Sequence, residues 1–280
     1  MTTTECERAT RAPSQPSPKR GRAVYPSRAP RGTALAAVLL ASLCACVTTP
    51  VTGRKALIPL SVEQDKELGA RAYAQAMAEV KLDDQHPQAP MVQKVVNRLV
   101  TVAQPDVPVK FDWEVHVIDD DQTVNAWCMP GGKMAVYSGI LPVTGNAAGL
   151  AVVMGHEIGH AVARHGSERM VQQMGIEVAL AYIAGDYSDL GGQVAALAVL
   201  MPWGRMQELE ADHIGLIYMA RAGYDPRTSV EFWERMAQMG GEAPPEWLST
   251  HPSNASRIQQ LQELMPAALA EYEAALAAKP

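Results

Sequence analysis

After residue 60 the chain carries its apolar residues mainly at helical spacing. Ser61 and Gln64 have the spacing of a capping box, which predicts a helix from there to about Met77. A second amphipathic helix is predicted after Pro90, because apolar residues recur every three or four positions at Val92, Val95, Val96, Leu99 and Val102. Pro105 and Pro108 end this pattern, so the first part of the chain is expected to be helical.

A short stretch that alternates apolar and polar residues then covers residues 111–118 and is typical of a half-buried strand. Two further strands are predicted at residues 125–130 and 133–138, with a turn at Gly131-Gly132 between them. Helical patterns return afterwards, at residues 146–167, 204–221, 225–239 and 254–265. The expected fold class is therefore α+β and mainly helical, with a small β-sheet beside the first of these later helices.

One hydrophobic segment, residues 170–201, raises the question of a membrane hairpin. Gly185–Gly192 interrupts it, and neither half comfortably reaches the roughly 20 apolar residues that cross a bilayer. We interpret it as a lid or a subunit interface, and the second interpretation would make the protein a homo-oligomer.

The N-terminal region has the features of an export signal. An apolar run of 11 residues, 33–43, follows a basic segment and is too short to span a bilayer. The run ends in Leu43-Cys44-Ala45-Cys46, which resembles a bacterial lipobox and predicts lipidation of Cys46. A simple cleaved signal is the alternative. Because Val47 replaces the Asp that retains such proteins in the inner membrane, we expect a lipid anchor on the periplasmic face of the bacterial outer membrane.

Composition and charge exclude some classes of protein. With 48% hydrophobic and 19% charged residues, the 280-residue chain is not wholly disordered. Beyond residue 45 there remain 17 basic and 28 acidic residues, a net charge of −11 that would repel nucleic acid. After removal of the signal and lipidation of Cys46, Cys128 is the one remaining thiol, so an internal disulfide is excluded. We expect Cys128 to be a buried strand residue.

The segment His156-Glu157-Ile158-Gly159-His160 indicates a metal site. On a helix, His156 and His160 are four residues apart and project from one face, close enough to share one zinc ion. Glu157 can reach a water on that metal and act as general base. The surrounding residues are apolar, and burying such polar groups without a partner would cost several kcal/mol.

A third ligand is expected from a later helix. His165 has the wrong spacing for a histidine ligand and is interpreted as structural. Glu208 and Asp212 share a helix face, so one of them can bind the metal while the other holds a ligand histidine. Glu210 points roughly the opposite way and is expected to be exposed to solvent.

These motifs together resemble the HtpX, Oma1 and CAAX-prenyl-protease type of zinc endopeptidases, and most of all its small periplasmic lipoprotein members, of the LoiP and BepA kind. The resemblance covers most of residues 47–265. Beyond the motifs already described, the matching segments are Pro50–Arg54, Asn125-Ala126 with Pro130–Gly132, Ala163–Gly166, Gly215, Ala222–Pro226, and Ser249–Pro252 with Arg257. Cys128 and Gly204 depart from the family pattern, but neither removes a ligand.

The resemblance implies a zincin-like (gluzincin) domain with one zinc ion on His156, His160 and Glu208, and with Asp212 behind the ligands. It implies that His251 lies near the metal, where it either stabilises the oxyanion or fills the open coordination position and keeps the enzyme latent. It also implies substrate binding by an edge strand, whose residues are Lys133, Met134, Ala135, Val136 and Tyr137. Arg257 is expected either to bind substrate or to anchor the loop that carries His251.

The expected domain boundaries are therefore residues 1–45 for the signal peptide, 46–60 for a lipidated tether, 61–270 for the metallopeptidase domain and 271–280 for a C-terminal tail. The leading hypothesis is a zinc-dependent endopeptidase that cleaves misfolded or misassembled proteins of the bacterial cell envelope. The alternative hypothesis is an envelope chaperone or assembly factor with a latent or inactive protease site.

Overall fold

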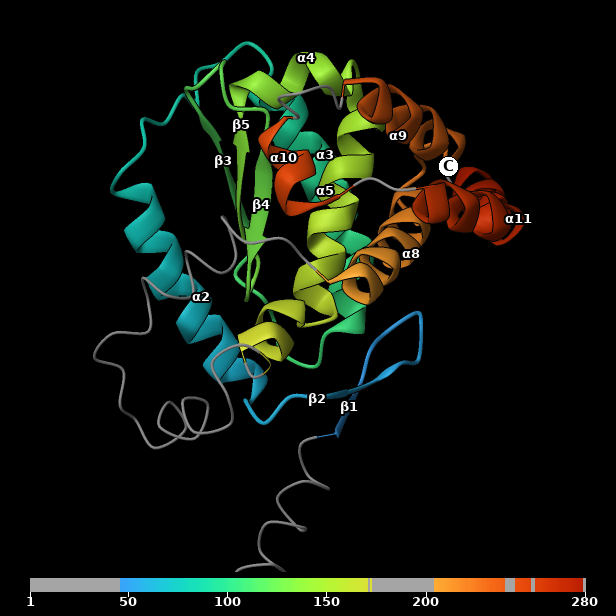
Figure 1. Cartoon of the computed structure of the whole chain (residues 1–280), viewed down its shortest axis with the longest axis horizontal. Coiled ribbons are helices and arrows are strands. Elements are labelled where there is room, and N and C mark those ends of the chain that lie inside the picture. Colours follow the sequence, from blue (N-terminus) through green and yellow to red (C-terminus); the bar gives the residue numbers. More distant parts are fainter. Residues whose placement is uncertain (1–45, 171, 173–203, 240–244, 253–254, 279–280) are drawn as a thin grey trace, which may run out of the picture. The chain divides into compact units, whose positions relative to one another are not determined.

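A small mixed sheet forms one layer of the computed structural model, which describes residues 46–170, 172, 204–239, 245–252 and 255–278 (Figure 1). Its strands are β3 (Glu114–Ile118), β4 (Ala126–Met129) and β5 (Lys133–Tyr137), in the order β3-β5-β4. Strand β5 is parallel to β3 and antiparallel to β4. The turn between β4 and β5 places Gly131 and Gly132 at φ values of 85° and 94°, which glycine adopts without strain.

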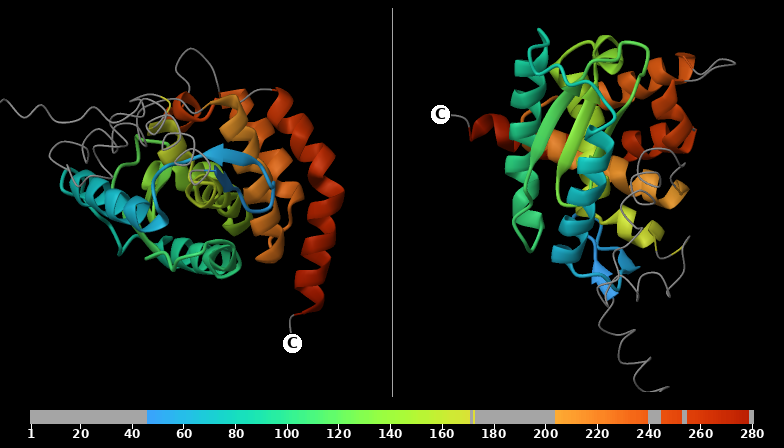
Figure 2. Two further views of the ribbon diagram at one scale, coloured as in Figure 1. Left: turned by 90° about the horizontal axis from the view of Figure 1, so that it is seen from below. Right: turned by 90° about the vertical axis from the view of Figure 1, so that its left-hand side faces the viewer.

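Helices cover both faces of this sheet (Figure 2). Helices α3 (Ala89–Ala103) and α5 (Ala147–Val162) pack on one face, and α2 (Val62–Met77) packs on the other. Because side chains alternate along a strand, Met134 and Val136 enter the core beneath α3 and α5, whereas Ala135 enters the core beneath α2. The α+β, mainly helical fold class is confirmed.

Most of the remaining described helices lie on the side of α5 that faces away from the sheet. They are α4 (Leu141–Thr144), α8 (Arg205–Arg221), α9 (Arg227–Met239), α10 (Glu246–Thr250) and α11 (Ala255–Ala277). The predicted capping box is present at the start of α2, where Ser61 Oγ accepts from the Gln64 backbone and Gln64 Oε1 accepts from the Ser61 N–H. In the part of the chain that the structure describes, no helix has the length and apolarity to cross a membrane.

Helix α11 is longer than predicted. Its apolar pattern was expected to end at residue 265, before Pro266, but the helix continues to Ala277 with Pro266 inside it. Buried Leu261 and Ala268 hold the two halves against the domain, and Glu271 accepts a hydrogen bond of 2.8 Å from Arg221. Residues 271–277 therefore belong to the helix and not to a separate tail. Of the predicted lid, 170–201, only residues 170 and 172 are among those described.

The prediction that residues 133–137 form a substrate-binding edge strand is wrong. Strand β5 is the central strand, and both of its backbone edges are paired, to β3 on one side and to β4 on the other. Met134, Ala135 and Val136 are fully buried, and Lys133 donates a hydrogen bond of 2.5 Å to Glu114. Residues 133–137 thus have no free edge for a substrate, and the prediction failed because strand order follows from tertiary pairing.

The expected tether at residues 46–60 is also corrected. Strands β1 (Cys46–Thr48) and β2 (Lys55–Leu57) form an antiparallel hairpin, and Ala56, Ile58 and Leu60 are buried in the core beneath α2. Cys46 begins the hairpin and is exposed with a free thiol. The segment is part of the folded domain, since its alternate residues find an apolar surface that the local sequence does not reveal.

Close contact between α5 and α8 brings the functional side chains of these two helices together. A Cβ atom placed on Gly215 would lie 2.7 Å from the backbone nitrogen of His156, and one on Gly159 would lie 2.9 Å from the carbonyl oxygen of Ala211. Glycine at these positions lets the two backbones approach, so that side chains of α8 reach the histidines of α5.

We predict that Gly215→Ala destabilises the fold by about 1–3 kcal/mol, because the added methyl group forces the α5 and α8 backbones apart. Urea denaturation followed by circular dichroism measures this change. Gly166→Ala is the matched control, since its Cβ would meet only the Pro130 side chain, at 3.4 Å. Equal stability of Gly215→Ala and wild type would contradict the close-approach argument.

Candidate metal centre

The two histidines of the H-E-x-x-H motif lie one turn apart on α5, as their spacing predicts. Their side chains are each only 2% exposed, and the Nε2 atoms of His156 and His160 are 3.1 Å apart. Asn146 caps this helix by accepting from the backbone N–H groups of Ala148 and Gly149. The helix is buried along almost its whole length, so both imidazoles lie away from bulk water.

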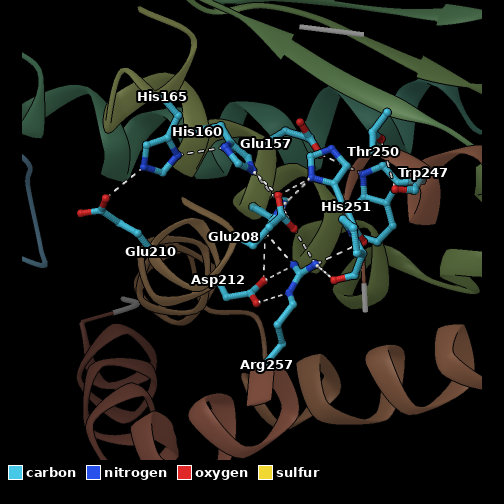
Figure 3. Close-up of polar contacts among 12 residues, drawn as sticks. Glu157, His160, His165, Glu208, Glu210, Asp212, Trp247, Thr250, His251 and Arg257 are labelled. Atoms are coloured by element: carbon cyan, nitrogen blue, oxygen red, sulfur yellow. Dashed lines mark hydrogen bonds and ion pairs between the residues drawn. The ribbon is translucent and has the colours of Figure 1, made fainter. Parts of the chain in front are cut away.

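Two further groups meet these nitrogens from other elements (Figure 3). Glu208, on α8, has Oε1 3.3 Å from His160 Nε2 and Oε2 3.7 Å from His156 Nε2. His251, at the end of α10, has Nδ1 3.1 Å from His156 Nε2 and 3.0 Å from Glu208 Oε1. All four ligand atoms lie within 4.8 Å of one another and all four residues are buried.

This set fits a zinc ion by its chemistry. His156 and His160 each use Nδ1 in a hydrogen bond to a protein group, which turns their Nε2 lone pairs toward one point. Two lone pairs at 3.1 Å repel one another unless a cation lies between them. Burial holds the pKa of His160 well below its ordinary value, so the imidazole is neutral, as a metal ligand must be. A buried set of imidazole nitrogen and carboxylate ligands is typical of zinc.

Asp212 lies behind the ligands, in the place predicted for it. Its Oδ1 atom accepts a hydrogen bond of 2.9 Å from His156 Nδ1, which fixes the tautomer of this histidine. Burial alone would raise the pKa of Asp212, but the charge and hydrogen bonds of Arg257 lower it. The carboxylate therefore remains ionised and accepts the His156 proton in its hydrogen bond.

Of the two roles expected for Arg257, the structure supports the anchoring of the His251 loop and not substrate binding. Its side chain is completely buried, and Nε and Nη2 donate to the two oxygens of Asp212 at 2.6 and 2.7 Å. Its Nη1 lies 2.6 Å from Glu208 Oε2 and donates to the carbonyl oxygens of His251 and Pro252. The guanidinium also stacks on the Trp233 ring at 3.6 Å. It fixes the site from within and does not face a substrate.

Glu157 points toward the same space as the ligands and is 3% exposed. Its Oε1 atom accepts a hydrogen bond of 2.9 Å from the indole N–H of Trp247, and His251 Nε2 lies 3.4 Å away. The sequence did not single out Trp247, because a tryptophan on a five-residue helix carries no motif. Trp247 and His251 both come from α10 and its end, so this short helix covers the Glu157 side of the site (Figure 3).

The expectation that Glu210 is exposed is wrong. Helical periodicity does place Glu210 away from Glu208, but the hairpin β1–β2 covers that side, and Glu210 is 6% exposed. It accepts hydrogen bonds from Thr49, Thr52 and Arg54 of the hairpin and from His165. His165 in turn contacts His160, so the residue interpreted as merely structural touches a metal ligand.

A buried H-E-x-x-H helix, with a glutamate from a later helix at the same point, defines a zinc metalloendopeptidase of the zincin class. The comparison with family models agrees, because the model of peptidase family M48 matches residues 86–265. The chain belongs to peptidase family M48.

Relatives support this assignment over most of the chain. The mitochondrial metalloendopeptidase OMA1 of Schizosaccharomyces pombe is 35% identical over 235 residues, which cover 80% of this chain and 68% of the relative. The Saccharomyces cerevisiae protein of that name is 33% identical, with 80% and 70% covered. The β-barrel assembly-enhancing protease of Escherichia coli is 28% identical, and the match covers 75% of this chain but 46% of that protein. The predicted family is thus confirmed, and more identity is shared with these mitochondrial members than with the bacterial one.

We predict that Glu208→Gln lowers the zinc content from about one ion per chain to a small fraction of that, because the amide is a far weaker ligand than the carboxylate. Metal analysis of the purified protein by mass spectrometry measures the loss. Exposed Glu234 provides the control, and Glu234→Gln is expected to keep its zinc. Equal zinc content in the two variants would contradict the assignment of Glu208 as a ligand.

Proposed function

We propose that this protein is a zinc endopeptidase of the bacterial cell envelope that cleaves misfolded or misassembled envelope proteins. The observation that carries the peptidase function is the position of Glu157 beside the cluster of His156, His160, Glu208 and His251. Zinc held by His156, His160 and Glu208 supplies a Lewis acid that polarises the peptide carbonyl and acidifies a bound water.

In this proposal Glu157 takes the proton of the attacking water and returns it to the nitrogen of the leaving amine. Trp247 directs the carboxylate by donating to Oε1 at 2.9 Å. Asp212 and Arg257 keep His156 in the tautomer whose Nε2 faces the metal. His251, with Nε2 3.4 Å from Glu157, can donate a hydrogen bond to the oxyanion that forms on the carbonyl oxygen.

Among the described residues β4 is an edge strand of the sheet, and it is the proposed substrate-binding strand in place of β5. The Tyr137 N–H donates to the Asn125 carbonyl, so by the alternation of an antiparallel pair the backbone groups of Ala126 and Cys128 point away from β5. This edge lies beside α5, which carries the motif. An extended peptide would pair with it through main-chain hydrogen bonds, which bind many sequences and suit unfolded substrates.

The envelope setting rests on the N-terminal sequence. The apolar run and Leu43-Cys44-Ala45-Cys46 favour export and lipidation of Cys46, with the anchor on the periplasmic face of the outer membrane. Exposure of Cys46 at the start of the hairpin is compatible with a lipid there. The relatives whose name refers to β-barrel assembly are bacterial members of the same family and support an envelope substrate.

A chaperone with a latent protease site is the second candidate, and one observation favours it. His251 Nδ1 lies among the ligand atoms, within 3.1 Å of His156 Nε2, and could fill the fourth position of the metal. The groups needed for hydrolysis, His156, Glu157, His160, Glu208 and His251, are each at most 3% exposed. A site in this arrangement would hold substrate on β4 without cutting until α10 moved.

Casein cleavage by the purified full chain separates the two candidates. We predict that wild type cleaves and that Glu157→Gln loses at least about 100-fold in rate while keeping its zinc, because a general base contributes roughly 10²–10⁴-fold. Cleavage that appears only in His251→Ala would identify a protease held latent by His251. Absence of cleavage in wild type and in His251→Ala, with zinc bound, would favour the chaperone.

Hydrogen exchange tests the substrate strand independently of cleavage. In zinc-bound Glu157→Gln, added unfolded casein is expected to slow exchange of the Cys128 amide, because this N–H points outward from β4. The Trp127 amide is the internal control, since it faces β5 and stays protected in either state. Unchanged exchange at Cys128 under saturating casein would exclude pairing at this edge.

A further inference from the structure

A continuous chain of polar contacts joins the N-terminal hairpin to a metal ligand. Thr49 Oγ1 donates to Glu210 Oε1 at 2.6 Å, and Arg54 pairs with Glu210 Oε2. Glu210 Oε2 lies 2.9 Å from His165 Nε2, and His165 Nδ1 lies 2.9 Å from His160 Nδ1 (Figure 3). The chain thus runs from residues 49–54 to His160 through two intermediate side chains.

Glu210 is held unusually firmly for a carboxylate outside the ligand set. Thr49, Thr52, Arg54 and His165 all donate to its two oxygens, and its side chain is 4% exposed. The opposite edge of the Arg54 guanidinium donates to both oxygens of Glu168, at 2.8 and 2.9 Å. The guanidinium therefore has one fixed orientation, and its hydrogen bonds hold the Glu210 carboxylate in turn.

The direction of the protons along this chain follows from the groups themselves. Glu210 receives the hydroxyl protons of Thr49 and Thr52 and an N–H of Arg54, so its carboxylate only accepts. His165 must then donate from Nε2 to Glu210, and since a neutral imidazole has one donor and one acceptor nitrogen, its Nδ1 is the acceptor. His160 must donate from Nδ1, which leaves the Nε2 lone pair for the metal.

We propose that the hairpin residues Thr49, Thr52 and Arg54 act through Glu210 and His165 as positioning residues for His160 and so set the zinc affinity of the enzyme. His156 has Asp212 and Arg257 behind it, and His160 has this second chain of residues in the same place. The proposal rests on the zinc centre of the proposed peptidase, but it concerns zinc binding and can fail independently of cleavage.

The simplest rival explanation is that the hairpin contacts only stabilise the fold. Both explanations predict that losing a hairpin contact lowers the melting temperature of the protein. Only a positioning role predicts that zinc binding weakens as well. It further predicts that Arg54 has no effect of its own once Glu210 can no longer transmit it.

The experiment measures the zinc Kd of the purified full chain by competition with a chromophoric chelator, together with the melting temperature of each metal-free variant. For Glu210→Gln we expect a Kd about 10-fold higher, within the 10–100-fold typical of partners behind a ligand histidine. For Arg54→Met we expect a smaller increase, about threefold. The double variant is expected to bind zinc within about twofold of Glu210→Gln, because Arg54 acts through Glu210.

The experiment also includes a matched control and a replacement in case Glu210→Gln does not fold. Tyr218→Phe is the matched control, because it removes a hydrogen bond of 2.8 Å to Asp106 from the same helix, ten residues beyond Glu208, and should leave the zinc Kd unchanged. If Glu210→Gln does not fold, the isosteric pair Thr49→Val and Thr52→Val removes two donors to Glu210 and should raise the Kd severalfold. A wild-type Kd in folded variants of Glu210 or of both threonines would overturn the proposal, as would additive effects of Arg54→Met and Glu210→Gln.

Discussion

The approach of two helices at glycine contacts is the constraint on which the structure depends. Helix α5 presents His156 and His160, and α8 presents Glu208, and these side chains meet because Gly159 and Gly215 let the backbones come together. A metal centre needs its ligand atoms within a few ångströms of one another, and side chains on two separated helices could not meet that requirement. The sheet, α3 and α9 then serve mainly to hold this pair of helices and exclude water from it.

Because water is excluded, each charged group near the metal site carries a large desolvation penalty unless it is paired with another polar group. The structure meets this demand with layers of hydrogen bonds behind the ligands. Asp212 and Arg257 support His156 and Glu208, and Glu210 with His165 supports His160. Each histidine is thereby restricted to one tautomer, with its lone pair directed inward. Glu157, the proposed general base, is buried in the same surroundings.

Because the site is buried, a substrate can reach it only past the elements that cover it. Trp247 and His251 come from α10 and its end. The Trp247 backbone N–H also donates to the Val124 carbonyl at 3.0 Å, just before β4, which is an edge strand among the described residues. The short helix thus borders the proposed substrate strand, the general base and the ligand cluster together. A peptidase that must not cut folded neighbours would benefit from such cover, since the peptide that enters has to be extended.

The sequence by itself determined most of the elements and part of the metal site: the turn at Gly131-Gly132 and the shared helix face of His156 and His160 follow from local spacing and residue chemistry. The choice of Glu208 over Asp212 came from the family resemblance, and the meeting of Glu208 with the two histidines came from the packing of α8 on α5. Tertiary structure alone decided which strand is central, which residues surround Arg257, and that Glu210 is buried. Periodicity tells on which side of a helix a residue lies, but not what covers that side. Strand order and the docking of residues 46–60 depend on contacts between segments distant in the chain, and local patterns do not encode those contacts.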